Sequence, residues 1–323
     1  MYIVVMSRII KYRETLRKFM MTKSFLLKIS GESRKILDRL LLSTDNLPGI
    51  IILTILNSQC KKNNIKIHGY YLATAIECLM QCCRINSNRN YYKSLYGADN
   101  LDNLYSEVIG WVHWSVAENI ETLRLNHPSF DPRIITISSE YCLKFIPNIL
   151  KKEELYSSLP MKKSDIFCYT FPNHTYIDAY KRKNRIEINI LKKNIDQKYG
   201  AVISLGICIA WLIGGGSRDK LHVMEKIGKD IGMFLKMAED LTTIERDVIT
   251  PSNNLNYVVN CGIKEAYNEF TIAKICFVED MLTLNIDSKT IRDVLESVME
   301  SVDSSMNDIS VDMLTQYDDC TPT

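Results

Sequence analysis

Two adjacent apolar segments with small residues constrain the fold of this chain most strongly. The first predicted helix covers residues 198–213 and the second covers 221–243, and the run 214–216 of three glycines ends the first. Apolar residues recur in the second segment at three- to four-residue spacing, which is typical of an amphipathic helix. Gly228 and Gly232 lie on one face of that helix, where each glycine lowers helix propensity by about 1 kcal/mol. This cost predicts a close approach of another helix at these glycines.

Three charged side chains lie near the end of the second helix. Glu239 and Asp240 are adjacent, and Lys236 precedes Asp240 by four residues. Side chains at this spacing are neighbours on a helix surface, so Lys236 can form an ion pair with Asp240. The two acids are therefore either candidates for chemistry or carboxylates that are neutralised within the protein.

The remaining chain also has mostly helical periodicity. Its 323 residues, of which 46% are hydrophobic, are sufficient for one large core or two domains. Further helices are predicted over residues 7–29, 31–42, 68–84, 99–125, 134–150, 257–284 and 288–306. We therefore expect an all-α fold in which the whole chain, 1–323, forms one domain.

Charge is unevenly distributed, although the net charge is only +2. Residues 1–40 contain ten Lys and Arg against three acids, whereas eight acids and no Lys or Arg follow Arg292. We expect a basic N-terminal helix (1–30), a polar insertion (about 151–196) and an acidic C-terminal tail (about 307–323). The basic stretch is either a solvated face or a face for a membrane, nucleic acid or acidic partner, although it contains no known nucleic-acid motif.

The ten cysteines have no paired spacing, and no signal peptide is predicted, so free thiols in a reducing, cytoplasmic compartment are expected. His68, Cys78, Cys82 and Cys83 could be proposed as a metal site. Their spacing does not suit a structural zinc, which favours buried thiols that pack as small apolar side chains. The most apolar stretch, 201–216, is short and rich in glycine, so no transmembrane segment is predicted.

The register of the two central helices resembles that of the trans-isoprenyl diphosphate synthases, the polyprenyl synthetase family. In that family one helix begins at a Lys-Thr pair, and the next carries Gly-x-x-Leu-Gly-x-x-Phe-Gln-x-x-Asp-Asp-x-x-Asp. Here Lys198-Tyr199 opens the first helix, and residues 228–243 follow the second pattern without a gap. The resemblance implies a single bundle of about ten or more helices around a central cavity, as in isoprenoid synthases.

The family's chemistry, as the resemblance implies it, uses Mg²⁺ to neutralise the leaving diphosphate of an allylic substrate. Carboxylates from two facing helices hold the metal ions, which act as a charge clamp. Glu239 and Asp240 stand at the first two acidic positions of the Asp-Asp-x-x-Asp motif, and Thr243 stands at the third. Glu239 and Asp240 are therefore the residual candidates for catalysis and Mg²⁺ binding. Lys198 and Lys236 are the candidates for binding substrate phosphates, and Lys236 replaces the glutamine of the pattern.

Two other family motifs are missing from this chain. A Gly-Lys-x-x-Arg motif binds isopentenyl diphosphate in the family, but Gly49 is followed by Ile50 and Leu53 at the cationic positions. The first aspartate-rich motif should lie on the 68–84 helix, but residues 78–98 contain no Asp or Glu. If Ile50, Met80 and Cys83 point inward, the former site becomes an apolar cavity that can hold a lipid.

Three functions are therefore considered. The first is a catalytically inactive isoprenyl diphosphate synthase homologue that serves as a structural, regulatory or binding subunit, in a homodimer or in a heterodimer with a homologue. The second is an active Mg²⁺-dependent prenyltransferase or terpene synthase with a rearranged site, and the third is an unrelated helical interaction protein. The helices after residue 257 resemble those of family members from large DNA viruses, which implies an infected host cell or a virion.

Overall fold

The computed structural model describes residues 2–29, 31–150, 167–170, 176–178, 186–249, 255–286, 288–307 and 310–313. The first half of the chain forms α1 (Tyr2–Thr22), the 3₁₀-helix η1 (Phe25–Lys28), α2 (Gly31–Leu42), α3 (Leu47–Lys62), α4 (Tyr70–Ser87), α5 (Arg89–Tyr96), α6 (Ala98–Asn126) and α7 (Arg133–Leu150). The second half forms α8 (Ile188–Ile195), the π-helix η4 (Asp196–Gly200), α9 (Ala201–Ile213), the 3₁₀-helix η5 (Arg218–Lys220), α10 (Leu221–Thr242), α11 (Ile244–Ile249), α12 (Tyr257–Cys261), α13 (Ile263–Thr283) and α14 (Lys289–Asn307).

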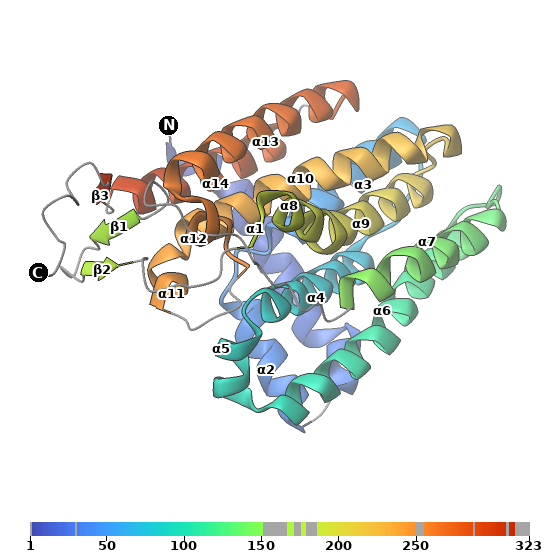
Figure 1. The fold of residues 1–323 in the computed structure, drawn as a ribbon. Coiled ribbons are helices and arrows are strands. Elements are labelled where there is room, and N and C mark those ends of the chain that lie inside the picture. The colour runs from blue at the N-terminus through green and yellow to red at the C-terminus, as the bar shows by residue number, and fades with distance from the viewer. Residues whose placement is uncertain are drawn as a thin grey trace, which may run out of the picture.

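The central helix of the bundle is α9, all of whose residues are buried. α3, α4, α7 and α10 pack around it, and α13 and α14 cover the outer side of α10 (Figure 1). Burial of an entire helix surface requires apolar residues on every side, which explains why this segment shows little amphipathic pattern. The expected all-α fold is confirmed.

The predicted close approach at the two glycines of α10 is also confirmed. A Cβ atom on Gly228 would lie 2.4 Å from Ser204 Cα, and one on Gly232 would lie 2.5 Å from the backbone nitrogen of Gly200. Backbone atoms occupy the space that a side chain would need, so glycine alone lets α10 lie this close to α9 and η4.

One predicted helix is interrupted. We predicted a continuous helix over 257–284, but Gly262, with φ of +93°, separates α12 from α13. This left-handed conformation suits glycine and ends α12 after Cys261. The apolar periodicity on both sides of Gly262 concealed the break. The short helix α5 was not predicted either.

A small antiparallel sheet lies at one end of the bundle, in the order β2-β1-β3 (Figure 1). Its strands are β1 (Phe167–Thr170), β2 (Tyr176–Asp178) and β3 (Ser310–Met313), and Cys168 pairs with Asp178 on one side and with Asp312 on the other. The sheet therefore joins described parts of the predicted polar insertion and of the predicted acidic tail. Most of both segments lies outside the described residues.

The basic N-terminal segment forms α1 and η1. Among the described residues, no single helix has the length and apolarity to cross a membrane, and only α2 together with α3, at a bend of 74°, meets these criteria.

Candidate functional site

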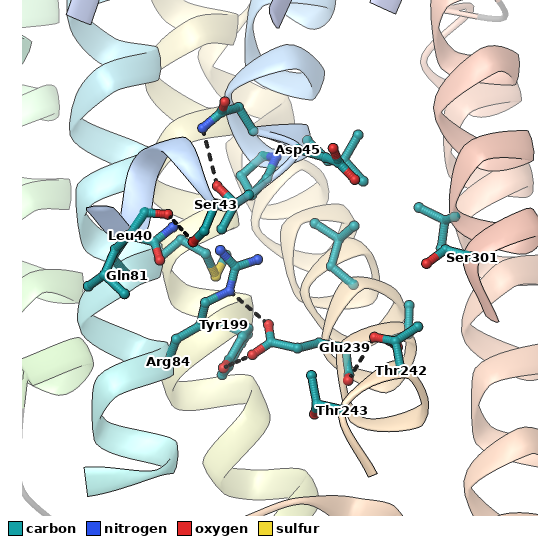
Figure 2. A pocket seen from close by; sticks show the side chains of 18 of the residues that line it. Leu40, Ser43, Asp45, Gln81, Arg84, Tyr199, Glu239, Thr242, Thr243 and Ser301 are labelled. Atoms are coloured by element: carbon teal, nitrogen blue, oxygen red, sulfur yellow. Dashed lines mark hydrogen bonds and ion pairs between the residues drawn. The ribbon is translucent and has the colours of Figure 1, made fainter. Parts of the chain in front are cut away.

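A cavity of about 320 Å³ lies between α4, α10 and α14 and is also lined by the segment that connects α2 to α3 (Figure 2). Its lining is mixed in polarity. The residues are Leu40, Ser43, Thr44, Asp45, Asn46, Leu47, Pro48, Met80, Gln81, Arg84, Tyr92, Tyr199, Leu235, Ala238, Glu239, Thr242, Thr243, Arg246, Ser297, Val298 and Ser301.

An ion pair crosses this cavity from α4 to α10. Arg84 Nε donates to Glu239 Oε2 at 2.9 Å, and Tyr199 Oη lies 3.5 Å from Glu239 Oε1 (Figure 2). Burial raises the pKa of Glu239, but the charges of Arg84 and Lys236 outweigh it, so the pKa lies below its ordinary value. Glu239 is therefore held as a carboxylate by a cation of the protein itself.

The second candidate acid, Asp240, does not line the cavity. It is fully buried, and its Oδ1 accepts from Lys236 Nζ at 2.5 Å while Oδ2 accepts from the backbone N–H of Tyr257 at 2.8 Å. Of the two alternatives that the sequence left open for Asp240, the structure therefore shows the Lys236–Asp240 ion pair. Burial raises the pKa of Asp240 to about 7, although Lys236 opposes this shift. Burial lowers the pKa of Lys236, but Asp240 together with the neighbouring Tyr199 and Glu239 outweighs burial, so the pKa is raised overall.

The two candidate acids thus have separate roles in the fold. Successive residues of a helix point about 100° apart, so when Glu239 faces the cavity its neighbour Asp240 faces the protein interior. Thr243, four residues after Glu239, also lines the cavity, but it carries a hydroxyl that donates to Asp247 Oδ2 at 2.8 Å.

The candidate phosphate-binding lysines lie outside the cavity lining. Lys198 is buried, and its Nζ donates to the carbonyl oxygen of Asn148 near the end of α7, at 2.5 Å. Lys236 is buried with Asp240, and its Nζ lies 5.0 Å from the centre of the Tyr199 ring. Neither ammonium group is among the groups that line the cavity.

Ile50 and Leu53, which stand at the family's two cationic positions, are buried in α3. Near them, the backbone N–H of Gly49 donates to Oε1 of the buried Glu77 at 2.7 Å. Of the three residues that were expected to make the site apolar, only Met80 lines the cavity, because Ile50 and Cys83 pack into the core. The condition for an apolar cavity is therefore not met, and the lining is mixed in polarity.

Sequence reasoning missed a hub of hydrogen bonds beside the cavity. Asp247 accepts from Asn88 Nδ2 and Arg246 Nε, both at 2.7 Å, and from Asn256 Nδ2 at 2.9 Å. Burial raises the pKa of Asp247, but Arg246 and the other donors outweigh burial and lower it overall. These hydrogen bonds of Asp247 connect α11 to the ends of α4 and α10. Asn88 lies 159 residues from Asp247 along the chain, so no local pattern connects these two residues.

Arg84 was also missed, although a local signal was present. It is the only charged residue between Glu77 and Arg89, and Glu77 is the only other charged residue of α4. Because a charge on a buried helix needs a partner, such an isolated arginine indicates an ion pair with another element.

The arrangement does not fit Mg²⁺ held by carboxylates of two facing helices. Among the described residues, no group of three or more His, Cys, Asp or Glu side chains is placed to hold a metal ion. Mg²⁺ prefers carboxylate and water oxygens, but Glu239 faces a guanidinium from α4, and Asp240 is enclosed with Lys236. Cys78, Cys82 and Cys83 are free, buried thiols that pack in the core.

The Arg84–Glu239 pair should make stability depend on pH. Because folding lowers the pKa of Glu239, the stabilisation is present above the ordinary value of 4.5 and is lost as the pH falls through the folded value. At pH 7, Glu239→Gln should lower the free energy of unfolding by about 1–3 kcal/mol. Urea unfolding of both proteins should show this difference shrinking below pH 4.5.

The exposed acid Glu140 on α7 provides the control, since Glu140→Gln should change stability little at either pH. A difference between wild type and Glu239→Gln that stays constant across this pH range would contradict the assigned ion pair.

Comparison with solved structures identifies the fold. A geranyltransferase from Helicobacter pylori, complexed with magnesium and isoprenyl diphosphate, aligns with a TM-score of 0.61 and 13% identity over 93% of this chain and 98% of that one. An FPP/GFPP synthase from Zymomonas mobilis aligns with a TM-score of 0.52 and 10% identity over 92% of this chain and 99% of that one.

A geranylgeranyl pyrophosphate synthetase from Pyrococcus horikoshii aligns with a TM-score of 0.51 and 10% identity over 96% of this chain and 94% of that one. Neither a protein-family model nor a curated protein sequence matches the chain. The fold is that of the all-α isoprenyl diphosphate synthases, which removes support for the alternative of an unrelated helical fold.

Proposed function

We propose that this protein is a non-catalytic relative of the isoprenyl diphosphate synthases, retained as a binding, regulatory or structural subunit. The observation that carries the proposal is the Arg84–Glu239 ion pair, at 2.9 Å. By the family resemblance, α4 is the helix that would carry the first acidic motif, and here it supplies a cation to Glu239 instead. The residual carboxylate is therefore neutralised by the protein and not by Mg²⁺.

The energetics support this proposal. Stabilisation of developing charge is usually the largest single contribution to catalysis, and removing one such group typically costs about 10²- to 10³-fold in rate. Here Glu239 and Asp240 are both engaged in internal ion pairs. Ile50 and Leu53, which stand at the positions that the family resemblance assigns to cations, are aliphatic and buried.

We further propose that the subunit acts in a homodimer or in a heterodimer with an active homologue. The fold similarity to the synthases supports this extension, as does the retention of the whole bundle, since the alignments cover more than 90% of the chain. A branch encoded by large DNA viruses is the proposed origin of the divergence, on the resemblance of the helices after residue 257.

An assay of isoprenyl diphosphate synthesis tests the proposal. Purified protein with radiolabelled isopentenyl diphosphate, each allylic diphosphate and Mg²⁺ should yield no product above background, at least about 10³-fold below the Helicobacter pylori geranyltransferase assayed alongside. Mg²⁺ with diphosphate should not raise the melting temperature.

Turnover that disappears in Glu239→Gln would overturn the proposal and favour an active enzyme with a rearranged site. Glu140→Gln, which changes an exposed acid on α7, is the matched control for that result.

A further inference from the structure

Two residues that line the cavity, Gln81 and Arg84, each carry a buried hydrogen-bond donor that no described residue uses. Gln81 is only 1% exposed, and its Nε2 is buried without a hydrogen-bond partner among the described residues. Arg84 Nη1 is in the same situation. A buried donor without an acceptor costs about 1–3 kcal/mol, so a ligand that supplies acceptors would recover that energy.

The two donors belong to one surface. Gln81 and Arg84 lie three residues apart on α4, which places both side chains on the same face of the helix. Both line the cavity, as Figure 2 shows. Arg84 uses Nε for Glu239, and a guanidinium has five N–H donors, so the edge that carries its Nη atoms can still bind an oxyanion.

The charges around the cavity disfavour a ligand with more than one negative charge. Its lining contains two cations, Arg84 and Arg246, and two anions, Asp45 and Glu239. Each has a partner within the protein: Arg84 pairs with Glu239, Arg246 with Asp247, and Asp45 with Arg13. Since these charges already balance, a polyvalent anion would bring excess negative charge, whereas a monoanion adds one charge beside two free donors.

The rest of the lining suits a short hydrocarbon chain. Five apolar side chains on these walls come from five different helices, namely Leu40, Leu47, Met80, Leu235 and Val298. Small-molecule sites typically combine such apolar walls with a few converging polar groups. A volume of about 320 Å³ leaves room for an aliphatic tail beside the anionic group.

We infer that this cavity binds a short aliphatic carboxylate without a divalent cation. One carboxylate oxygen accepts from Gln81 Nε2 and the other from Arg84 Nη1, and the chain lies against the apolar wall. The inference rests on the proposed function, because it gives the non-catalytic subunit a ligand and uses the cavity from which metal chemistry has been lost.

Thermal unfolding in EDTA with added hexanoate tests the inference. Hexanoate should raise the melting temperature of the wild type saturably, by roughly 2–6 °C. Gln81→Met keeps the volume and removes the donor, and it should weaken binding by about tenfold or more. Arg84→Lys keeps the positive charge beside Glu239 but removes the Nη donors of the guanidinium. It therefore gives a second test if Gln81→Met folds poorly.

Gln59→Met is the matched control. Gln59 on α3 is also buried and also has an unpartnered Nε2, but it does not line the cavity. Its variant should therefore retain the hexanoate shift.

Three results would overturn the inference: no shift in the wild type, an equal shift in Gln81→Met and the wild type, or an equal shift with hexanol. Tighter binding of hexyl phosphate than of hexanoate would overturn the assignment to a monoanion. The turnover assay runs in parallel and separates the two proposals, since isoprenoid turnover contradicts the proposed function whatever hexanoate does.

Discussion

Lys236→Met should lower the free energy of unfolding by about 3–5 kcal/mol, because it leaves a buried carboxylate without its partner. Lys236 and Asp240 are 4% and 0% exposed, and their 2.5 Å contact lies in the core between α10 and the start of α12. For a domain of this size each kcal/mol corresponds to about 2–4 °C in melting temperature, so the change should be large in both thermal and urea unfolding.

The pH dependence of that variant has a defined sign. Burial already raises the pKa of Asp240, to about 7, and loss of Lys236 removes an opposing effect. A carboxyl group with a raised folded pKa is favoured in its neutral form, so stability is retained at low pH and falls as the pH rises through the folded value. Lys236→Met should therefore be closer to wild type at pH 5 than at pH 8.

A matched pair on the same helix provides the control. Lys226 and Asp230 have the same four-residue spacing, at 2.6 Å, but Lys226 is 68% exposed. Lys226→Met should cost less than about 1 kcal/mol. The double variant Lys236→Met/Asp240→Asn should recover much of the loss, since asparagine can still accept from Tyr257. Equal effects of Lys226→Met and Lys236→Met would contradict the role of the buried pair.

Gly232→Ala should destabilise the protein by about 3 kcal/mol or more, since overpacking typically costs about 1–3 kcal/mol and here the obstacle is backbone. The added Cβ would lie 2.5 Å from Gly200 N and 2.6 Å from Gly200 Cα. A side chain could rotate away from such a contact, but η4 would have to move as a unit. The Gly228→Ala change should act similarly, because its Cβ would lie 2.4 Å from Ser204 Cα.

Gly110→Ala is the control for this test, because a Cβ at that position on α6 meets no heavy atom within 4 Å. Without a clash, the higher helix propensity of alanine should stabilise the protein by about 0.5–1 kcal/mol. Urea unfolding of the three variants measures the comparison. A stabilising Gly232→Ala would show that α10 and η4 are not as close as described.

Local patterns predicted much of the secondary structure. The predicted helix 31–42 has the bounds of α2, and 99–125 differs from α6 by one residue at each end. The close helix contact at the two glycines was also correctly predicted, and the Lys236–Asp240 pair was one of the two alternatives considered. All of these features depend on residues within one or two helical turns of each other, and the sequence spacing alone specifies such neighbours.

The sequence by itself therefore determined most of the long helices, the tight contact of α10 and the absence of the family's acidic motif from α4. Only the tertiary structure decided that Arg84 meets Glu239 across 155 residues, and that Glu239 rather than Asp240 faces the cavity. The rotation of each helix about its axis and its register against its neighbours set these contacts. Both follow from the packing of the whole core, which no local spacing encodes.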